Sequence, residues 1–409
     1  MSSVHLAVAA CVLAPALAFA QARPITVHAD TLLDGKGQVL RDQIITVTGS
    51  KITSIAPGKG PADYELHGLT VMPGWIDPHV HIDWHFGLNG KSNPPGEKPQ
   101  EAILFAAENA YATLMGGFTT VQSVGSPNDK YLRDVINRGV LPGPRVLTSL
   151  SALTDRNAGT PDQIRQWVRQ TAKDGADLIK IFASGSSRDG GNKSLSDEQI
   201  QAACGEARAV GLRAMVHAQR DDAAIPSILA GCTALEHGTY FSDKVMQMIA
   251  ERGVYFTPNV GLVSQNYVEN KEHFIGTGNY TEETIALTAT LIPIKLEMFK
   301  RALEVKNLKM PFGTDAVAGA HGRNIEELIA RVQQGGQDPM AALIGVTSLA
   351  AEALGLEKQI GSLAPGMEAD IVAVQGNPLQ DVTTMRHPLF IMKAGKVYLN
   401  SPARPVGLR

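Results

Sequence analysis

The middle of the chain alternates between short apolar segments and helical segments, and this alternation constrains the fold more than any other feature. The apolar segments predict eight strands, one at His79 and the others at residues 118–121, 145–147, 178–182, 213–217, 234–237, 254–258 and 310–315. The segments between them predict helices at residues 101–115, 130–138, 161–173, 197–210, 223–230, 243–252 and 282–304. Such alternation is typical of a parallel sheet. Eight units within about 250 residues have the size of a (β/α)8 TIM barrel, so the predicted fold class is α/β.

The two ends of the chain differ from the middle, because they carry short strands and turns. Residues 25–29, 43–47, 51–55 and 69–72 predict strands at one end, and residues 370–374, 389–392 and 396–398 predict strands at the other. Neither group has enough strands to bury a sheet face alone. We therefore expect residues 24–72 and 362–405 to pair into one small β-sandwich domain. Residues 73–361 would then form the barrel as an insertion between them.

Polar side chains occur at or near the ends of several predicted barrel strands. His79 and His81 lie two residues apart, so on a strand their side chains point to the same face. The complete set is His79, His81, Lys180, His217, His237 and Asp315. Each alone has an ordinary explanation, such as a core histidine or a helix cap. Because active sites of such barrels lie at the carboxyl ends of the strands, the whole set predicts one site.

The chemistry of this set favours a metal centre. Imidazoles and a carboxylate are ligands that suit Zn²⁺ or a related divalent ion. A lysine ammonium cannot be a ligand because it has no lone pair, so Lys180 must be neutral or carry a carbamate. A carbamate has two oxygens that can bridge two metal ions, which would share and activate a hydroxide. Asp315 would bind one metal and accept the proton of the attacking water.

The first twenty residues predict a secretory signal peptide. Residues 6–20 are almost wholly apolar, and Ala18-Phe19-Ala20 before Gln21 fits a cleavage site. This predicts a periplasmic or secreted protein. The segment Val8-Ala9-Ala10-Cys11 resembles a lipoprotein cleavage box, but the apolar run before Cys11 is short for lipoprotein anchoring. After cleavage only Cys204 and Cys232 remain, and the sequence leaves open whether they pair.

Charge and hydropathy exclude some partners. The net charge is −3 with both signs mixed, which predicts no nucleic-acid partner. No apolar run in the body of the chain reaches the roughly 20 residues of a membrane-spanning helix. A small molecule is the expected partner, and a homo-oligomer is possible.

Several motifs together resemble the amidohydrolase superfamily. They are residues 73–81, Lys180 and residues 216–218, 236–238, 313–316 and 361–372. The resemblance implies a binuclear member with a carboxylated Lys180. His79, His81 and Asp315 would hold one metal, His217 and His237 the other, and Lys180 would bridge them. Residues 313–324 are especially similar to imidazolonepropionase-related Xaa-Pro dipeptidases and carboxypeptidase-like amidohydrolases, including bacterial enzymes that degrade ochratoxin.

The resemblance implies a zinc-dependent hydrolase of amide bonds. The expected substrate is a dipeptide or N-acyl amino acid with a free carboxylate, and ochratoxin A, cleaved to phenylalanine and ochratoxin alpha, is one example. A carboxylate needs a cation or donor, and the candidates are His321, Arg323, Tyr240 and Arg188. A cyclic-amide hydrolase or a deaminase of the same fold is the alternative. A non-catalytic scaffold would lack ligands, whereas all six are present.

Overall fold

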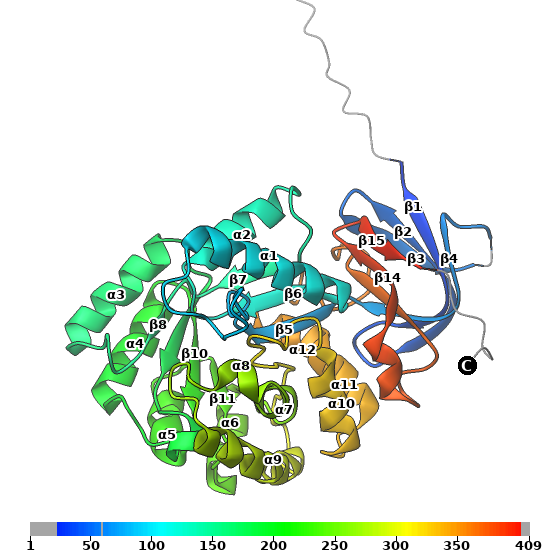
Figure 1. Ribbon diagram of the computed structural model, residues 1–409. Helices are drawn as coiled ribbons and strands as arrows, with labels where there is room; N and C mark the ends of the chain where they lie inside the picture. The colour runs from blue at the N-terminus through cyan, green and yellow to red at the C-terminus, as the bar shows by residue number, and fades with distance from the viewer. Residues whose placement is uncertain (1–22, 59, 402–409) are drawn as a thin grey trace, which may run out of the picture.

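The computed structural model describes residues 23–58 and 60–401. The predicted signal peptide and the alternative lipoprotein box lie outside these residues. Within them, a seven-stranded sheet lies beside a larger α/β unit (Figure 1). No helix in the described ranges is long and apolar enough to cross a membrane.

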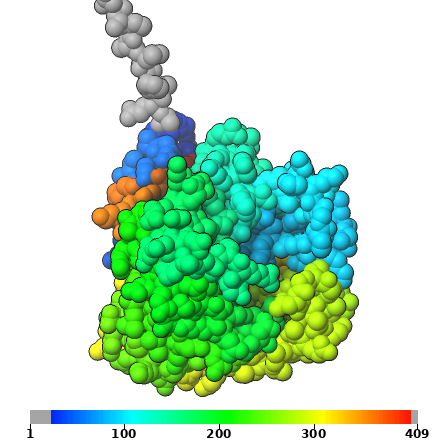
Figure 2. Space-filling view, turned by 90° about the vertical axis from the view of Figure 1, so that its left-hand side faces the viewer, coloured from blue at the N-terminus to red at the C-terminus, as the bar shows by residue number. Residues whose placement is uncertain are grey.

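Strands from both ends of the chain form the seven-stranded sheet, in the order β15-β14-β13-β4-β1-β2-β3. Its strands are β1 (Ile25–Leu33), β2 (Val39–Thr48), β3 (Lys51–Pro57), β4 (Tyr64–Pro73), β13 (Ile371–Gln375), β14 (Pro388–Lys393) and β15 (Lys396–Asn400). The two ends meet where β4 pairs antiparallel with β13, with Pro73 opposite Ile371. Figure 2 shows the same association on the surface, where the blue and orange segments lie side by side.

All seven strands belong to one hydrogen-bonded ladder rather than to two separate sheets. The reason is that β4 pairs with β1 on one side and with β13 on the other, so the ladder continues between the two ends. The edge strand β3 is partly covered, since Ile52 N donates to Met367 O at 2.9 Å and accepts at its carbonyl from Gly366 N at 2.8 Å. The domain boundaries predicted from the sequence stay a prediction.

Parallel strands in the middle of the chain fall into two sheets. One contains β5 (Trp75–Val80), β6 (Phe118–Ser123) and β7 (Arg145–Thr148). The other contains β8 (Ala152–Leu153), β9 (Leu178–Phe182), β10 (Arg213–Ala218), β11 (Ala234–His237) and β12 (Tyr255–Thr257). All pairings within both sheets are parallel, so the predicted α/β alternation is confirmed. A closed eight-stranded barrel is not, because the ladder is interrupted.

The predicted eighth strand at residues 310–315 is not a strand. Only isolated bridges flank it, from Lys309 to Tyr255 of β12 and from Ala316 to Val80 of β5. The prediction was wrong for two physical reasons. Pro311 has no N–H to donate to a ladder, and Asp315 has a left-handed backbone with φ +57°. The segment nevertheless lies against β5, because Asp315 N donates to His79 O at 2.8 Å.

Helices surround the parallel strands. They are α1 (Pro99–Met115), α2 (Asn128–Asn137), α3 (Pro161–Lys173), α4 (Asp197–Ala209), α5 (Asp221–Leu229), α6 (Asp243–Arg252), α7 (Leu262–Glu269), α8 (Lys271–Phe274), α9 (Glu282–Leu303), α10 (Ile325–Gln333), α11 (Pro339–Val346) and α12 (Ser348–Ala353). Thr160, Ser196 and Thr281 start α3, α4 and α9 with reciprocal capping boxes, which satisfy backbone N–H groups that a helix leaves free. The sequence did not predict α7, α8 or α10–α12.

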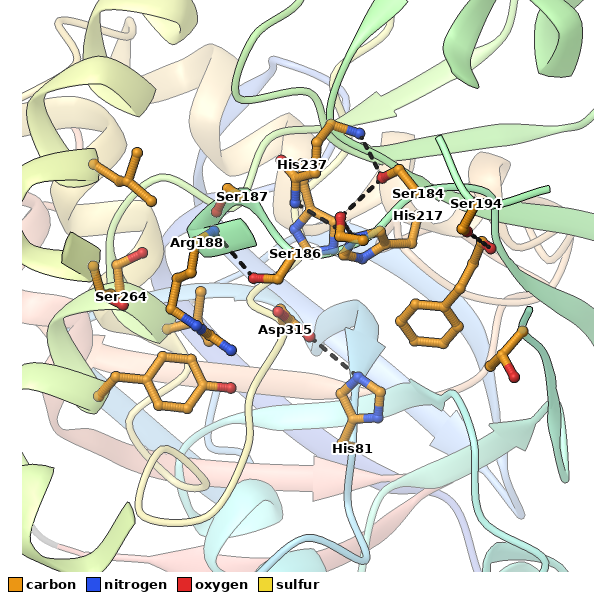
Figure 3. A pocket seen from close by; sticks show the side chains of 18 of the residues that line it. His81, Ser184, Ser186, Ser187, Arg188, Ser194, His217, His237, Ser264 and Asp315 are labelled. Atoms are coloured by element: carbon orange, nitrogen blue, oxygen red, sulfur yellow. Dashed lines mark hydrogen bonds and ion pairs between the residues drawn. The ribbon is translucent and has the colours of Figure 1, made fainter. Parts of the chain in front are cut away.

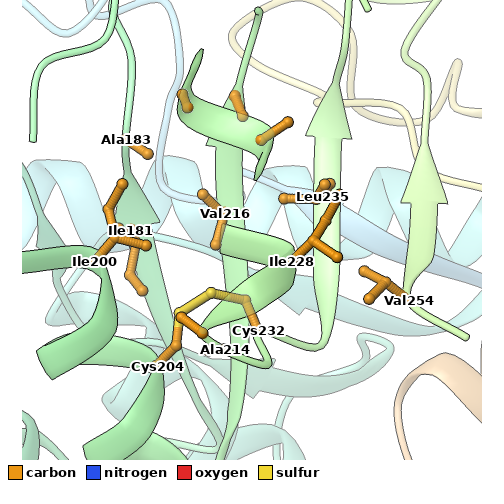
Figure 4. Packing of buried hydrophobic residues seen from close by; sticks show 14 of the residues in the cluster. Ile181, Ala183, Ile200, Cys204, Ala214, Val216, Ile228, Cys232, Leu235 and Val254 are labelled. Atoms are coloured by element: carbon orange, nitrogen blue, oxygen red, sulfur yellow. A yellow bond between two sulfur atoms is a disulfide. The ribbon is translucent and has the colours of Figure 1, made fainter. Parts of the chain in front are cut away.

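The largest apolar core lies between the five-stranded sheet and its helices. Ile181, Val216 and Leu235 contribute from the strands, and Ile200 contributes from α4. A disulfide joins Cys204 of α4 to Cys232, just before β11, within this core (Figure 4). It resolves the pairing that the sequence left open.

Candidate active site

Four of the predicted ligands come from separate parallel strands and converge. His79 lies one residue before the end of β5, Lys180 lies in β9, His217 in β10, and His237 ends β11. Ligand atoms of His79, His237 and Asp315 lie within 4.8 Å of one another. The chain reverses sharply after β11, because His237 has φ +74° and Gly238 has φ +60°. A side chain at Gly238 would also collide with the rings of Phe241 and Phe256.

Asp315 joins the two histidines of the His-x-His motif. Its Oδ1 lies 3.2 Å from His79 Nε2 and 3.2 Å from His81 Nε2. In Figure 3, Asp315 lies between Arg188 and His81, and the ion pair to His81 is dashed. His81 also stacks on Trp84 with ring centroids 4.3 Å apart, so the imidazole that contacts Asp315 is held on its face.

Burial keeps the imidazoles of His79, His217 and His237 neutral. Burial lowers the pKa of His217 to about 3. Burial also lowers the pKa of His79 and of His237 well below the usual range. The rings of His217 and His237 lie edge to face, 4.3 Å apart. A neutral imidazole is the form that binds a metal. The buried environment of these histidines therefore suits metal ligands better than imidazolium ions paired with carboxylates.

Lys180 is fully buried between these groups. Its Nζ lies 3.3 Å from His79 Nε2, and within the described residues no carboxylate lies within ion-pair distance of it. Burial lowers the pKa of Lys180, although Glu236 and Asp315 oppose this effect. Burying an ammonium without an ionic partner costs free energy. A neutral Lys180 amine, or its carbamate, therefore fits this buried position better than the charged side chain does.

Glu236 holds His79 from behind, a role that the sequence did not assign to it. Its Oε2 lies 2.8 Å from His79 Nδ1, and both side chains are buried. A carboxylate that accepts from Nδ1–H leaves the Nε2 lone pair free for a metal. Nε2 is the atom that faces Asp315 and Lys180. The donor set and its orientation therefore fit a metal centre.

The cluster forms one end of a cavity of about 370 Å³. All six predicted metal ligands line it, and so does Arg188. Three other predicted carboxylate contacts do not line it. His321 lies behind the site with Nε2 3.1 Å from His81 O, and Arg323 pairs with Glu269 at 2.8 Å. Tyr240 donates its hydroxyl to Ser187 O at 3.0 Å. Each of these side chains is therefore directed to a protein partner.

The model of the amidohydrolase family matches residues 70–398. The chain belongs to the amidohydrolase family. This confirms the resemblance that the motifs indicated.

Two relatives illustrate what this amidohydrolase is similar to. Ochratoxinase of Aspergillus niger is 24% identical over 442 aligned residues, which cover 95% of this chain and 89% of the relative. The crystal structure of a Xaa-Pro dipeptidase with bound methionine is 29% identical, with a TM-score of 0.84 over 92% of this chain and 100% of the other. The crystal structure of A. niger ochratoxinase has a TM-score of 0.79 at 21% identity and covers 93% of this chain and 96% of that one.

The family and these relatives support a hydrolase that acts on carbon–nitrogen bonds of amides. The family is typically metal-dependent, and the candidate ligand cluster agrees with that. A small-molecule substrate is consistent with a cavity of this size.

The amidohydrolase also has a buried cation in the cavity that the sequence did not single out. Lys295 of α9 is 7% exposed, and its Nζ donates to Ser264 Oγ at 2.8 Å. Burial lowers the pKa of Lys295 to about 8, although Asp315 and Glu327 oppose this effect. Its spacing four residues after the buried Leu291 was a usable signal, because that spacing puts both on the same helix face.

Arg188 is the second cation in this part of the cavity. Its guanidinium carbon lies 5.2 Å from the ring centroid of Tyr267 and 4.7 Å from that of Tyr280. Its Nε is buried and has no hydrogen-bond partner in the part of the chain that the structure describes. Neither Arg188 nor Lys295 forms an ion pair with a carboxylate there. The cavity therefore has a positively charged wall.

Proposed function

We propose that this amidohydrolase cleaves the amide bond of a dipeptide or N-acyl amino acid that has a free carboxylate. One observation carries the proposal: the same cavity contains the candidate metal ligands and two largely buried cations, Arg188 and Lys295, that form no ion pair within the described residues. Ochratoxin A is one candidate of this chemical class, because the relative from A. niger is an ochratoxinase.

The barrel predicted from the sequence is the frame of this proposal. We propose that the two parallel sheets and residues 309–316 together make one (β/α)8 ring, in which the short β7 and β8 are two pieces of one barrel strand. The link between the sheets is supported by the bond from Asp177 N to Thr148 O at 2.8 Å. The bridges from Tyr255 to Lys309 and from Val80 to Ala316 support closure on the other side.

The proposed cofactor is a pair of Zn²⁺ ions. His79, His81 and Asp315 would hold one ion, His217 and His237 the other, and a carboxylated Lys180 would bridge them. When bound, the ions supply a Lewis acid for the carbonyl and lower the pKa of the attacking water. The carbamate would form when the neutral Lys180 amine adds to CO₂, with an N–C bond formed and one amine proton released to water.

Asp315 is the proposed proton carrier. Its carboxylate faces the cavity and is 18% exposed, whereas the carboxylate of Glu236 is buried behind His79. Asp315 would accept a proton as water adds to the amide carbonyl and return it to the departing amine nitrogen. Its left-handed backbone fixes the carboxylate next to His79 and His81.

Arg188 and Lys295 would position the substrate by its carboxylate. A hydrogen bond to a charged partner contributes about 1.5–3 kcal/mol, so each cation is expected to change KM about 10–100-fold. Tyr267 and Tyr280 pack around Arg188 and hold it toward the cavity. The amide bond would then lie between these cations and the candidate metal ligands.

A substrate series tests this function. The zinc-loaded enzyme is offered N-acyl amino acids, Xaa-Pro dipeptides, ochratoxin A, matched amides without the carboxylate, and cyclic amides. We expect substrates with the carboxylate to have the higher kcat/KM, by about 100-fold or more. Activity confined to cyclic amides would refute the proposal.

Variants of the cavity cations make the test specific. Arg188→Met and Lys295→Met should raise KM for carboxylate substrates and leave KM for the matched amides nearly unchanged. Arg156→Met is the matched control, because Arg156 also lines the cavity but is exposed. An equal effect of all three variants would contradict the assignment.

We also propose that the protein is periplasmic or secreted. The apolar leader supports this, and so does the disulfide between Cys204 and Cys232, because disulfides persist in oxidising compartments. Cell fractionation and N-terminal sequencing test the proposal, with Gln21 expected as the first residue of the mature chain. Recovery of the full-length chain from the cytosol would contradict it.

A further inference from the structure

Two histidines and two carboxylates gather on the seven-stranded sheet, outside the cavity. His28 and Asp30 lie on β1, and Glu65 and His67 lie on β4. The two strands are parallel, with His28 opposite Glu65, and their register shifts between Ala29 and Thr31. None of the four side chains lines the cavity described above.

The four side chains lie within contact distance of one another. His28 Nδ1 lies 2.9 Å from Glu65 Oε2. His67 Nδ1 lies 3.1 Å from Asp30 Oδ1, and His67 Nε2 lies 3.3 Å from Glu65 Oε2. One potential ligand atom from each of His28, Asp30 and His67 lies within 4.8 Å of the others.

The contacts among these four side chains leave one ring nitrogen of His28 without a partner. Its side chain is only 6% exposed, and its Nε2 is buried without a hydrogen-bond partner among residues 23–58 and 60–401. Buried polar atoms are almost always satisfied, so an unpaired ring nitrogen requires a reason. A lone pair on Nε2 is what a metal ion would use.

Glu65 gives His28 the orientation that a metal ligand needs. A carboxylate that accepts from Nδ1–H fixes the tautomer and leaves Nε2 as the electron-pair donor. The same arrangement occurs in the cavity, where Glu236 Oε2 lies 2.8 Å from His79 Nδ1. The sheet therefore repeats, with different residues, the pairing of a buried histidine and a carboxylate behind it.

We propose that His28, Asp30 and His67 bind a divalent transition-metal ion, with Glu65 orienting His28. Two imidazoles and a carboxylate favour Zn²⁺, or Co²⁺, Ni²⁺ and Cu²⁺, over Mg²⁺ and Ca²⁺. Zinc lies about 2.0–2.2 Å from such ligands, so the present spacing has to contract. The side chains of His67 and Asp30 are 65% and 38% exposed and have room to turn. Water would complete the coordination.

Zinc stoichiometry tests the site in the whole protein. The chain is stripped with a chelator, dialysed against buffered Zn²⁺, and analysed for zinc per chain. We expect the wild type to bind one more zinc than the double variant Asp30→Asn/His67→Gln, with the same rate of amide hydrolysis. Equal zinc content and equal affinity would overturn the site and leave three ordinary histidine–carboxylate pairs.

Two controls separate this site from the cavity. His387→Gln removes an exposed histidine elsewhere on the chain and should keep the wild-type zinc content. His237→Asn alters the cavity and should lose hydrolysis but keep the zinc that Asp30→Asn/His67→Gln loses. If His237→Asn abolished both hydrolysis and the binding of this additional zinc, that zinc would belong to the cavity and the proposal would fail.

The role of Glu65 has its own test. Glu65→Leu should weaken this zinc about 10–100-fold, as expected for loss of a carboxylate behind a ligating histidine. Unchanged affinity in a variant that melts like the wild type would overturn the orienting role. Anomalous scattering at the zinc edge locates the ion directly, and a peak at His28 Nε2 is the expected result.

Discussion

Burial decides the charge of most side chains that face the cavity. Burial keeps His79, His217 and His237 neutral and raises the pKa of Glu236 to about 8. Glu236 is therefore a carboxylate acceptor for His79 Nδ1–H above that pH, or at lower pH when a bound cation stabilises its charge. Lys295 keeps its charge at neutral pH with only a small margin. The affinity of the cavity for anions should therefore depend on pH in a range that enzymes experience.

The pH dependence of Lys295 is the first prediction. With a pKa of about 8, Lys295 is a cation below pH 8 and loses its proton above it. The value of kcat/KM for carboxylate substrates should therefore fall about tenfold per pH unit above 8, since kcat/KM reports groups of the free enzyme. Steady-state kinetics from pH 6 to 10 measure this.

A substrate without a carboxylate is the control, because Glu236 also titrates at about 8. For the matched amide, kcat/KM should not show the decrease above pH 8 that deprotonation of Lys295 causes. Lys295→Arg keeps a positive charge and should move the fall to higher pH. An identical profile for both substrates would assign the titration to another group.

Glu236 provides the second prediction. Glu236→Leu removes the acceptor of His79 Nδ1 and should weaken zinc binding in the cavity about 10–100-fold. Competition with a chromogenic chelator measures this affinity. Glu236→Gln retains an oxygen acceptor and should recover part of the loss. If both variants bound zinc like the wild type, Glu236 would have no orienting role.

At the residue scale, sequence reasoning found the side chains that strand periodicity places at strand ends. His79 and His81 share a face because side chains alternate, and His217 and His237 terminate short apolar runs. Lys295 was missed because it lies in a long helix, where a lysine is ordinarily at the surface. The position of His321 could not be read from its distance to Asp315 along the chain, because the turn that follows Asp315 directs it behind the site.

At the element scale, the disulfide fixes α4 to the segment that leads into β11. Cys204 and Cys232 are buried in the core beneath β10 and β11. Cross-links of this kind stabilise proteins by about 2–4 kcal/mol. The strand that ends at His237 begins two residues after Cys232, so the cross-link also fixes the start of a ligand-bearing strand.

The third prediction follows from that position. Cys204→Ala/Cys232→Ala should lower the free energy of unfolding by about 2–4 kcal/mol, because the denatured chain is no longer constrained. Thermal melting with and without a reductant measures the effect. The reductant should destabilise the wild type and leave the double variant unchanged, and equal sensitivity of the two would contradict the prediction.

The elements that the sequence predicted well are those with strong local signals. β9 and β11 have the predicted bounds because each is a short, largely apolar run, and α6 has the predicted bounds between Asp243 and Arg252. The short helices α7 and α8 have no extended apolar stripe. The strand expected at residues 310–315 failed because one left-handed residue, Asp315, cannot be recognised in an apolar run.

At the scale of the whole molecule, one ion pair connects the seven-stranded sheet to the parallel strands. Arg145 of β7 donates from Nη1 to Asp370 Oδ2 at 2.9 Å. Asp370 precedes β13 and is 4% exposed. Its Oδ1 also accepts from Ala394 N at 2.7 Å, and its carbonyl accepts from Gly74 N at 2.8 Å.

The fourth prediction concerns this connection. Asp370→Asn should lower the free energy of unfolding by about 2 kcal/mol, since hydrogen bonds to charged groups contribute about 1.5–3 kcal/mol. Denaturant titration measures the change. Asp162→Asn is the control, because Asp162 forms an exposed pair with Arg165, and pairs of that kind contribute little. Equal effects would contradict the structural role of Asp370.

The association of the two chain ends could be predicted from their short strands, because neither group has enough strands to bury a sheet face alone. The single continuous ladder could not. It depends on β4 pairing with β1 and β13 at once, and pairing between distant segments leaves no local signal in a sequence.

That long-range pairing has a consequence for the newly made chain. Thr70 of β4 donates to Gly376 O from a position 306 residues earlier. At about 5–20 residues per second, a ribosome needs about 15–60 s to add that many residues. During this interval β4 has an open edge, which is the kind of surface on which strands of other chains add and aggregation begins. Chaperone binding to the nascent N-terminal strands should therefore be an ordinary part of the synthesis of this protein.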